Sequence, residues 1–329
     1  MNWLDRSVLV TGAGGFIGSH LVEALAGRGA RVRAFLRYTS RSDNGLLRFV
    51  DPATLEAVEI VLGDLRDGDA IRQASTGVDT IFHLGALIGI PYSYVHPREV
   101  VDTNVFGTFN VLEAARLCNV RRLVHTSTSE VYGTALAARI DEGHRLQGQS
   151  PYSASKIGAD KLVESYARSF GVSAVTIRPF NTYGPRQSAR AIVPTIITQA
   201  LAGREVRLGS LIPTRDLTFV GDTVAGFILG AEQDAAVGLE INLGTDREVS
   251  IGDLAHQIAR LVGSDINVVE DPARIRPERS EVMRLHADAS LAHRVLGWHP
   301  AVELEAGLAE TVEWVRQHAD LYRAGTYEV

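Results

Sequence analysis

The sequence contains a single cysteine, Cys118, among 329 residues. One cysteine can form neither an internal disulfide nor a cysteine-based metal cluster, so the fold depends on an ordinary apolar core. The ten histidines show no ligand spacing such as His-x-x-x-His, and we therefore expect no metal. A chain of this length can bury about 75% of its unfolded surface and needs no covalent staple.

Basic charge is also scarce, since 33 Lys and Arg face 39 Asp and Glu, which gives a net charge of −6. A nucleic-acid-binding chain is normally basic, so we expect no nucleic-acid partner. No apolar run reaches the ~18 residues that a membrane span needs, and the first residues lack a signal-peptide layout. These absences predict a cytoplasmic protein without a membrane partner.

A strand, a glycine-rich turn and a helix open the chain. Residues 7–11 form a short apolar run suited to a buried parallel strand, and apolar residues at helical spacing follow the turn. Gly12 allows a tight exit from the strand, Gly15 admits backbone amides to a pyrophosphate, and Gly18 permits close packing of helix and sheet. Because this Gly-x-x-Gly-x-x-Gly pattern lies between strand and helix, it predicts dinucleotide binding rather than a structural turn.

The second strand, residues 31–36, is followed by Arg37, where an NAD-preferring site places an acidic residue. A guanidinium suits a 2′-phosphate, so the sequence favours NADP over NAD, although Arg37 capping an exposed strand end is the alternative. Strands over residues 58–62 and 80–84 place further residues beside the cofactor. The expected cofactor-binding residues are Gly12, Gly15, Phe16, Ile17, Gly18, Arg37, Asp64, Leu65, Leu84, Ala86, Tyr152 and Lys156.

The alternation of strands and helices predicts an α/β fold, a Rossmann-type doubly wound parallel sheet with a smaller mixed α/β domain. We expect residues 1–178 to form the dinucleotide-binding domain, with a return segment near 220–243. Residues 179–329, where the alternation loosens, are expected to form the substrate-binding domain. Apolar spacing predicts a final helix over residues 303–323.

Tyr152 and Lys156 form the candidate chemical centre. They lie one turn apart on a predicted helix and point the same way. A tyrosine with a pKa near ~10 is a poor base at neutral pH; a nearby ammonium supplies part of the stabilisation that its phenolate needs, and a positively charged nicotinamide ring would supply more. Tyr-x-x-x-Lys alone is common on solvated helices, but here it follows a dinucleotide-binding turn.

Polar side chains also follow the strand predicted at residues 122–126. Thr128, Ser129 and Glu130 come at its carboxyl end, where open α/β sheets bind ligands. A hydroxyl and a carboxylate at this place are candidate acid–base groups. A strand-end carboxylate paired with an arginine is the alternative for Glu130.

Together these motifs resemble the extended short-chain dehydrogenase/reductase family that modifies nucleotide sugars. The resemblance rests on Gly12, Gly15 and Gly18, on residues 128–133, on Tyr152 with Lys156, and on residues 178–185, 215–216 and 296–300. Thr-Ser-Glu before Val-Tyr-Gly resembles 4,6-dehydratases or glucuronate decarboxylases more than 4-epimerases. Residues 90–94, 125–135, 181–190 and 208–211 are similar to bacterial LegB-type dehydratases, which act on UDP- or GDP-linked N-acetylglucosamine.

The resemblance implies a mechanism. Tyr152, assisted by Lys156 and Thr128, removes the proton of the sugar 4-hydroxyl while hydride moves from C4 to a tightly bound, recycled NADP or NAD. Glu130 then takes the C5 proton, water leaves from C6, and the hydride returns there. Ser129 stands where many hexose dehydratases carry an aspartate, so Glu130 is expected to serve as both base and acid, with Ser129 as a possible further catalytic residue.

The resemblance also implies how the substrate is held. The expected substrate contacts are Asn181, Arg215, Arg276 with Arg279 as its rival, and Ser93. Arginine suits the diphosphate because its planar fork can hold two phosphate oxygens. Segment 134–149, rich in small and charged residues, is expected to form a loop over the sugar site.

Two other functions remain open. A nucleotide-sugar 4-epimerase or a UDP-glucuronate decarboxylase would begin its reaction with the same step at Tyr152 and Lys156. A non-catalytic dinucleotide-sensing or scaffold protein would bind cofactor without turnover, and the presence of Thr128 disfavours it. The family resemblance further implies a homodimer formed through the helices near residues 102–117 and 152–169.

Overall fold

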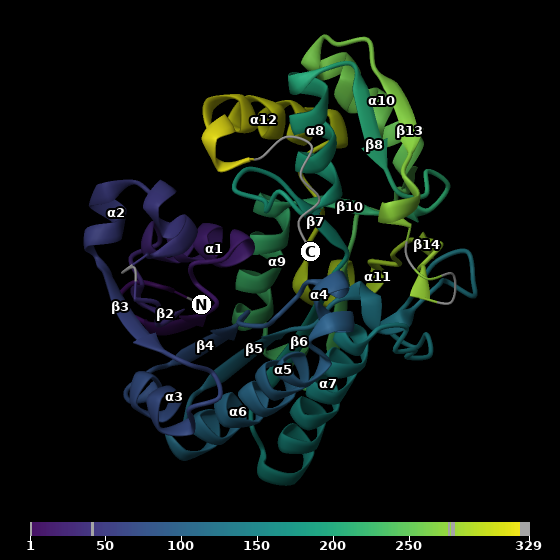
Figure 1. The fold of residues 1–329 in the computed structure, drawn as a ribbon. Helices are drawn as coiled ribbons and strands as arrows, with labels where there is room; N and C mark the ends of the chain where they lie inside the picture. Colours follow the sequence, from purple (N-terminus) through teal and green to yellow (C-terminus); the bar gives the residue numbers. More distant parts are fainter. Residues whose placement is uncertain (1, 41–42, 276, 278–279, 323–329) are drawn as a thin grey trace.

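The protein is described by a computed structural model that covers residues 2–40, 43–275, 277 and 280–322. Its centre is a seven-stranded parallel sheet in the order β11-β6-β5-β4-β1-β2-β3 (Figure 1). The strands are β1 (Ser7–Thr11), β2 (Arg31–Arg37), β3 (Val58–Gly63), β4 (Thr80–His83), β5 (Arg122–Thr126), β6 (Ala174–Pro179) and β11 (Glu240–Leu243). This order confirms the predicted Rossmann-type doubly wound sheet.

Helices cover both faces of the sheet (Figure 1). One face carries α1 (Phe16–Ala26) and α9 (Val220–Glu232), and the other carries α3 (Gly68–Ser75), α6 (Gly107–Leu117) and α7 (Pro151–Phe170). Successive side chains of β1 belong to different cores, with Val8 and Val10 under α1 and Leu9 under α6. Because both faces are buried, this strand has a continuous apolar run instead of an alternating one.

The start of α7 is fixed by its own sequence. The Ser150 hydroxyl accepts a hydrogen bond from the Ser153 amide at 3.1 Å, and the Ser150 amide donates to the Ser153 hydroxyl at 2.9 Å. Pro151 occupies the first helical position, where its missing amide costs nothing. This cap places Tyr152 and Lys156 on the first two turns, at the level of the strand ends.

The second lobe is a mixed α/β unit. Its elements are α8 (Ile192–Ala202), α10 (Ile251–Val262), α12 (Leu304–Gln317), the paired strands β8 (Glu205–Leu208) with β13 (Asn267–Glu270), β7 (Asn181–Tyr183) with β10 (Leu217–Phe219), and β9 (Thr214–Arg215) between β12 (Val249–Ser250) and β14 (Arg284–Leu285). Shorter helices are α2 (Pro52–Glu56), α4 (Ile90–Val95), α5 (Pro97–Val101) and α11 (Ser290–Leu296). The apolar core under α1 continues without a break into this lobe.

The final helix is shorter than predicted. It ends at Gln317, because His318 leaves the helical conformation with φ −125° and ψ 37°. A 3-10 turn, Ala319–Leu321, follows it. The prediction of a helix to residue 323 was therefore wrong over its last turn, and residue 323 itself lies outside the described residues.

We propose that the chain divides into a dinucleotide-binding domain of residues 1–178 and a substrate-binding domain of residues 179–329. The segment near 220–243 crosses back, because α9 packs on the sheet and β11 pairs with β6. The structure adds a further crossing that the sequence did not indicate, since α11 packs against β11 and α9.

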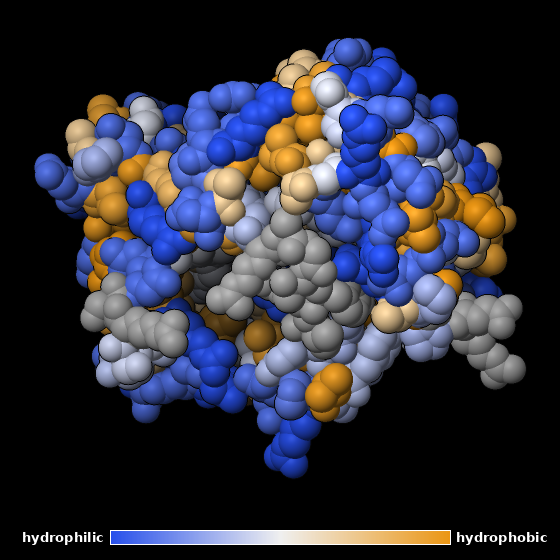
Figure 2. All heavy atoms as spheres, turned by 45° about the horizontal axis from the view of Figure 1, so that its top comes forward, coloured by the Kyte–Doolittle hydropathy of each residue, from blue (hydrophilic) through white to orange (hydrophobic). Residues whose placement is uncertain are grey.

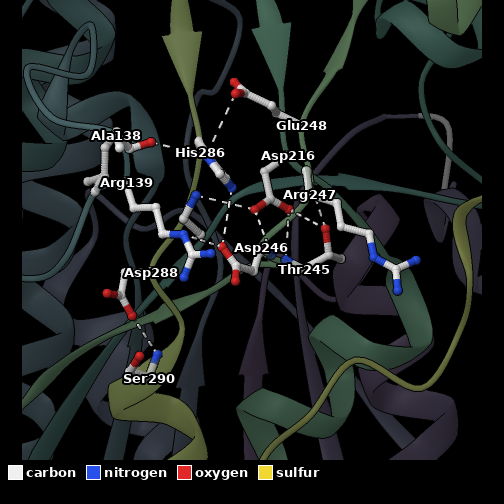
Figure 3. Close-up of polar contacts among 12 residues, drawn as sticks. Ala138, Arg139, Asp216, Thr245, Asp246, Arg247, Glu248, His286, Asp288 and Ser290 are labelled. Carbon is white, nitrogen blue, oxygen red and sulfur yellow. Dashed lines mark hydrogen bonds and ion pairs between the residues drawn. The ribbon is translucent and has the colours of Figure 1, made fainter.

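The buried carboxylate of Asp216 organises the turn that links β11 to β12, the first strand of the three-stranded sheet β12-β9-β14 (Figure 3). Asp216 is fully buried and accepts hydrogen bonds from the amides of Thr245 at 2.8 Å, Asp246 at 3.1 Å and Ala287 at 3.2 Å. Asp246 has a positive φ of 60°, and the hydrogen bond from its amide holds that strained conformation. These bonds tie the residues that precede β12 to the residue that follows β14 by two positions.

Segment 134–149 is anchored to the same region. Its Ile140 amide donates to the His286 carbonyl at 2.8 Å, and Arg139 Nε lies 2.8 Å from an Asp246 carboxylate oxygen (Figure 3). The segment is irregular, as predicted. However, it is tied to β14 and the residues after it instead of folding over the cleft described below, and none of its residues lines that cleft.

The surface is mainly hydrophilic. On the face shown in Figure 2, blue side chains dominate and orange apolar side chains form separate groups between them. Within the described part of the chain, every helix is too short or too polar to cross a bilayer.

Leu9→Ala should lower the free energy of unfolding by about 3 kcal/mol, because the removed methyl groups leave a cavity in a fully buried site on β1. Urea denaturation measures the loss. Leu4→Ala, at a side chain that is 62% exposed, is the matched control and should change stability by less than ~0.5 kcal/mol. Equal losses for the two variants would contradict the assigned packing of β1.

Candidate active site

A cleft of about 1170 Å³ lies at the carboxyl ends of the central strands. Its walls include residues at or just after the ends of β1, β2, β3, β4, β5 and β6, together with residues of the second lobe. Typical small-molecule sites measure roughly 300–1,000 Å³, so this cleft has room for a dinucleotide and a second ligand.

The glycine-rich turn has no room for side chains. Gly12 has a φ of 69°, and a Cβ atom there would lie 2.7 Å from the Gly85 nitrogen. A Cβ on Gly18 would collide with the Gly12 carbonyl oxygen. Gly15 precedes the first residue of α1 and lines the cleft, so the helix N-terminus faces it. This bare backbone at a helix N-terminus fits a pyrophosphate.

Charged residues surround the end of the cleft beside β2 and β3. Arg37 is 62% exposed, lines the cleft, and lies 3.8 Å from the Glu99 carboxylate. Asp64 receives two hydrogen bonds from the Arg66 guanidinium, at 2.9 Å and 2.6 Å. These bonds are the main reason that the pKa of Asp64 is lowered to about 2. The carboxylate is therefore ionised throughout the neutral range.

The remaining predicted cofactor residues also face the cleft, except for Lys156. Those on its wall are Phe16, Ile17, Leu65, Leu84, Ala86 and Tyr152. Asn104, in a π-helical stretch over Asp102–Phe106, holds the loop after β4 in place. Its side chain accepts from the Leu87 amide at 2.8 Å and donates to the Leu87 carbonyl at 2.9 Å. The helix predicted over residues 102–117 thus begins with a widened turn that directs Asn104 inward.

Thr128, Ser129, Glu130 and Tyr152 line one cavity. Thr128 caps a 3-10 turn, accepts a hydrogen bond from the Glu130 amide at 3.2 Å, and lies beside the Tyr152 side chain. Burial raises the pKa of Tyr152 well above its usual value; the Thr128 hydrogen bond opposes this rise and the charge of Glu130 adds to it. The two segments that carry the predicted acid–base residues therefore meet at one point.

Lys156 lies beneath this group rather than on the cleft wall. It is buried, and its Nζ donates to the Thr126 carbonyl at 2.6 Å. Burial lowers its pKa to about 8, while the charge of Asp160 opposes the shift. The sequence led us to expect that Lys156 would make Tyr152 more acidic. The protein alone does not achieve this, because burial dominates, so activation needs a further positive charge in the cleft.

A family profile described as GDP-mannose 4,6 dehydratase matches residues 9–311. The chain belongs to the NAD-dependent epimerase/dehydratase family. It is 36% identical to a UDP-glucose 4-epimerase of Mycolicibacterium smegmatis over 94% of this chain and 98% of the relative. It is 32% identical to a dTDP-glucose 4,6-dehydratase of the same organism, over 96% of this chain and 95% of that protein.

A solved structure with a similar fold is DesIV, a dTDP-glucose 4,6-dehydratase of Streptomyces venezuelae with NAD bound. It superposes with a TM-score of 0.86 at 30% identity, covering 97% of this chain and 99% of the other. Relatives named as 4,6-dehydratases support a dehydratase type of enzyme within the epimerase/dehydratase family. The resemblance of the sequence to nucleotide-sugar-modifying reductases is thus confirmed at the level of the family.

The predicted substrate residues of this epimerase/dehydratase are distributed unevenly. Asn181 lines the cleft, and its buried side-chain oxygen has no hydrogen-bond partner among the described residues. Arg215 lines it too, with its guanidinium 3.3 Å from the Glu281 carboxylate. Arg276 and Arg279 lie outside the described residues.

Ser93 is the one described substrate residue without support from its surroundings. Its side chain is fully buried, and its hydroxyl donates to the Ile90 carbonyl at 2.6 Å within α4. It does not line the cleft. The first turn of α4 holds this hydroxyl against its own backbone, so the expected contact between Ser93 and a substrate has no geometric basis.

Several cleft residues escaped the sequence reasoning. The most informative are Thr39, Ser40, Arg190, Arg274 and Glu281. Thr39 and Ser40 follow Arg37 closely, and their hydroxyls could have been recognised as phosphate ligands. The other three come from distant parts of the second lobe and carry no local spacing that marks a site.

Gly12→Ala should weaken cofactor binding by at least ~10-fold, because the added methyl group collides with Gly85 and shifts the turn. Titration with NAD and NADP, followed by tryptophan fluorescence, measures the change. Gly77→Ala is a matched control, since Gly77 has a similar φ of 72° but no atom within 4 Å of the new methyl group. That variant should lose some stability and keep cofactor affinity; equal affinity losses would argue against the turn as the binding site.

Proposed function

We propose that the protein is an NAD(P)-dependent sugar-nucleotide 4,6-dehydratase that acts on UDP- or GDP-linked N-acetylglucosamine and yields a 4-keto-6-deoxy sugar nucleotide. The observation that supports this most is that Glu130 and Tyr152 line one cavity and are joined through Thr128. A dehydratase needs a proton acceptor near C4 and another acid–base group near C5 and C6 of the same ring.

Each residue of this cavity has a distinct task in the proposal. The Tyr152 side chain, as the phenolate that it would form beside a bound cofactor, takes the proton of the sugar 4-hydroxyl, and Thr128 orients that sugar hydroxyl. Glu130 removes the C5 proton and returns a proton to the leaving C6 hydroxyl, because Ser129 is too weak an acid to do so. The bound dinucleotide supplies a reversible hydride acceptor. Its positive nicotinamide ring also meets the requirement for further positive charge beside the buried Tyr152 hydroxyl.

Arginines on the second lobe support a diphosphate ligand. Arg215, Arg274 and Arg190 all line the cleft, and the Glu281 carboxylate holds the first of them in place. Guanidinium groups can bind two phosphate oxygens at once. We propose that Arg215 is the main diphosphate contact, with Asn181 nearby. A diphosphate contact by Arg276 or Arg279 stays a prediction, because both lie outside the described residues.

An epimerase or a decarboxylase of the same family is the second candidate. The 36% identity to a UDP-glucose 4-epimerase favours the epimerase as much as the 32% identity to a dTDP-glucose dehydratase favours the dehydratase. An epimerase needs only oxidation and reduction at C4, so it has no use for an acid–base carboxylate at Glu130. The task of Glu130 therefore separates the two reactions.

Glu130→Gln should strongly slow product formation while sugar-nucleotide and cofactor affinities stay within a few-fold of wild type, because the amide keeps the shape but cannot accept a proton. The rate should fall by roughly 10²–10⁴-fold, the usual contribution of a general acid–base group. Mass spectrometry of UDP- and GDP-N-acetylglucosamine after incubation measures the reaction, as loss of one water.

The control is Glu164→Gln, on the partly exposed side of α7 and paired with Lys161, which should leave the rate unchanged. Unchanged substrate mass with inversion at C4 would identify an epimerase. Loss of carbon dioxide from UDP-glucuronate would identify a decarboxylase. A fully active Glu130→Gln variant would remove Glu130 from the mechanism.

We propose NADP as the preferred cofactor, because Arg37 lines the cleft at the end of β2, followed by the hydroxyls of Thr39 and Ser40. Arg37→Ala should weaken NADP binding by ~10-fold, the value of a lost charge-assisted contact, and leave NAD binding nearly unchanged. Isothermal titration with both cofactors measures this. Arg33→Ala, which removes a β2 arginine paired with Glu59 outside the cleft, should change neither affinity. Equal losses for both cofactors in Arg37→Ala would contradict NADP selectivity.

We also propose a cytoplasmic homodimer. Apolar side chains are exposed on or next to the two helices expected at the interface, with Phe106 57%, Phe109 40% and Phe170 56% exposed. Pairing these surfaces in a second copy would remove them from water. The single cysteine suits a reducing compartment, where no disulfide is available to the fold.

A further inference from the structure

A buried carboxylate lies beneath the cleft, one helical turn beyond Lys156. Asp160 is 1% exposed and is held by groups from two strands. Ser127 donates its hydroxyl hydrogen at 2.7 Å, His125 Nε2 lies at 3.2 Å, and Arg178 donates at 2.9 Å. Three partners fix a carboxylate that touches neither the cleft nor solvent, although its position on α7 places it on the same side as Lys156.

The region around Asp160 contains as many cationic as anionic side chains. Arg178 has a second carboxylate, Glu240, at 2.9 Å, and also donates to the Tyr132 hydroxyl at 2.9 Å. Arg178 forms the direct ion pairs with both carboxylates, and Lys156, one helical turn before Asp160, is the second cation of the region and is affected by the charge of Asp160. Without Asp160 this buried region would contain two cations and one carboxylate, a costly arrangement in a low dielectric.

The other titratable groups facing Lys156 do not supply the missing negative charge. His83 on β4 and His125 on β5 are fully buried, and burial lowers the pKa of both, that of His125 to about 4. Both rings are therefore neutral at working pH. The His125 Nδ1 has no partner among the described residues, so the ring hydrogen lies on Nε2 and points to Asp160. Tyr152 is un-ionised in the protein alone, since burial raises its pKa.

We propose that Asp160 is a positioning residue of the active site: its fixed carboxylate is the counter-ion that keeps the Lys156 side chain charged beneath Tyr152. Ser127 and His125 hold the carboxylate in its ionised form, and Arg178 fixes its orientation. The catalytic meaning of this arrangement rests on the proposed function. The pH range of activity is then set by a residue that never contacts the substrate.

The sequence itself offers a direct test, because Lys156 and Lys161 are its only lysines. Selective ¹³C labelling of lysine gives two Cε signals, and Lys161, half-exposed beside Glu164, is an internal reference. In Asp160→Asn the titration midpoint of Lys156 should fall by ~1–3 pH units, the usual range for the loss of a nearby opposite charge. The Lys161 signal should not move.

Two further variants separate charge from packing. Asp160→Glu keeps the charge and should return the Lys156 midpoint toward the wild-type value. Asp216→Asn removes a carboxylate that is equally buried but lies between β9 and β10, hydrogen-bonded to Thr245 and Ala287. It should lower stability and leave the Lys156 midpoint unchanged.

The rate profile is the functional readout. Activity should decline as pH rises through the Lys156 midpoint, which lies about pH 8 in the wild type, because the ammonium then loses its proton. Asp160→Asn should move this decline to lower pH. A purely structural role would reduce the amount of folded enzyme without moving the decline.

Two results would overturn the proposal. One is an unchanged Lys156 midpoint in folded Asp160→Asn. The other is a Lys156 midpoint below ~7 in the wild type, since buried lysines without a counter-ion titrate near 5–6. This measurement tests the role of Asp160 even if Asp160→Asn does not fold. A shifted midpoint in a protein that converts no sugar nucleotide would instead support the counter-ion and defeat the proposed function.

Discussion

The contact between Thr128 and Tyr152 is the constraint on which the rest of the site depends. It joins the carboxyl end of β5 to the first turn of α7, two segments that the chain separates by the irregular stretch 134–149. The Ser150 cap fixes where α7 begins, and the 3-10 turn after Thr128 fixes where Glu130 points. A hydroxyl, a phenol and a carboxylate thus line the same cleft, each held by a capped turn or helix start.

Burial works against every charge in this region. It raises the pKa of Tyr152 and lowers the pKa values of Lys156, His83 and His125. Such opposing effects are common where a protein prepares groups for proton transfer. The arrangement under Tyr152 is consistent with this pattern. Burial lowers the pKa of Lys156 to about 8, and the proposed role of Asp160 is to keep this lysine protonated at neutral pH.

The sequence predicted what is local and missed what folding assembles. Gly12 and Tyr152 could be placed because each belongs to a short pattern inside one strand–turn–helix unit or one helix. Arg274 and Glu281 could not, because they reach the cleft only through the packing of the second lobe. Segment 134–149 was predicted as irregular, yet its anchoring through His286 depends on a strand far away in sequence. The burial that raises the Tyr152 pKa in the protein alone could not be read from the sequence either, since burial is a tertiary property.

The crossings of the chain between its two halves limit how the protein can be divided. Six of the seven central strands come from the chain up to Pro179, and β11 pairs with the outer side of β6. Cutting the chain after β6 would leave that strand as a bare sheet edge, with unpaired amides and carbonyls able to recruit strands from other molecules. A fragment cut at this point would therefore also expose the apolar side chains that α9 and β11 cover in the whole chain.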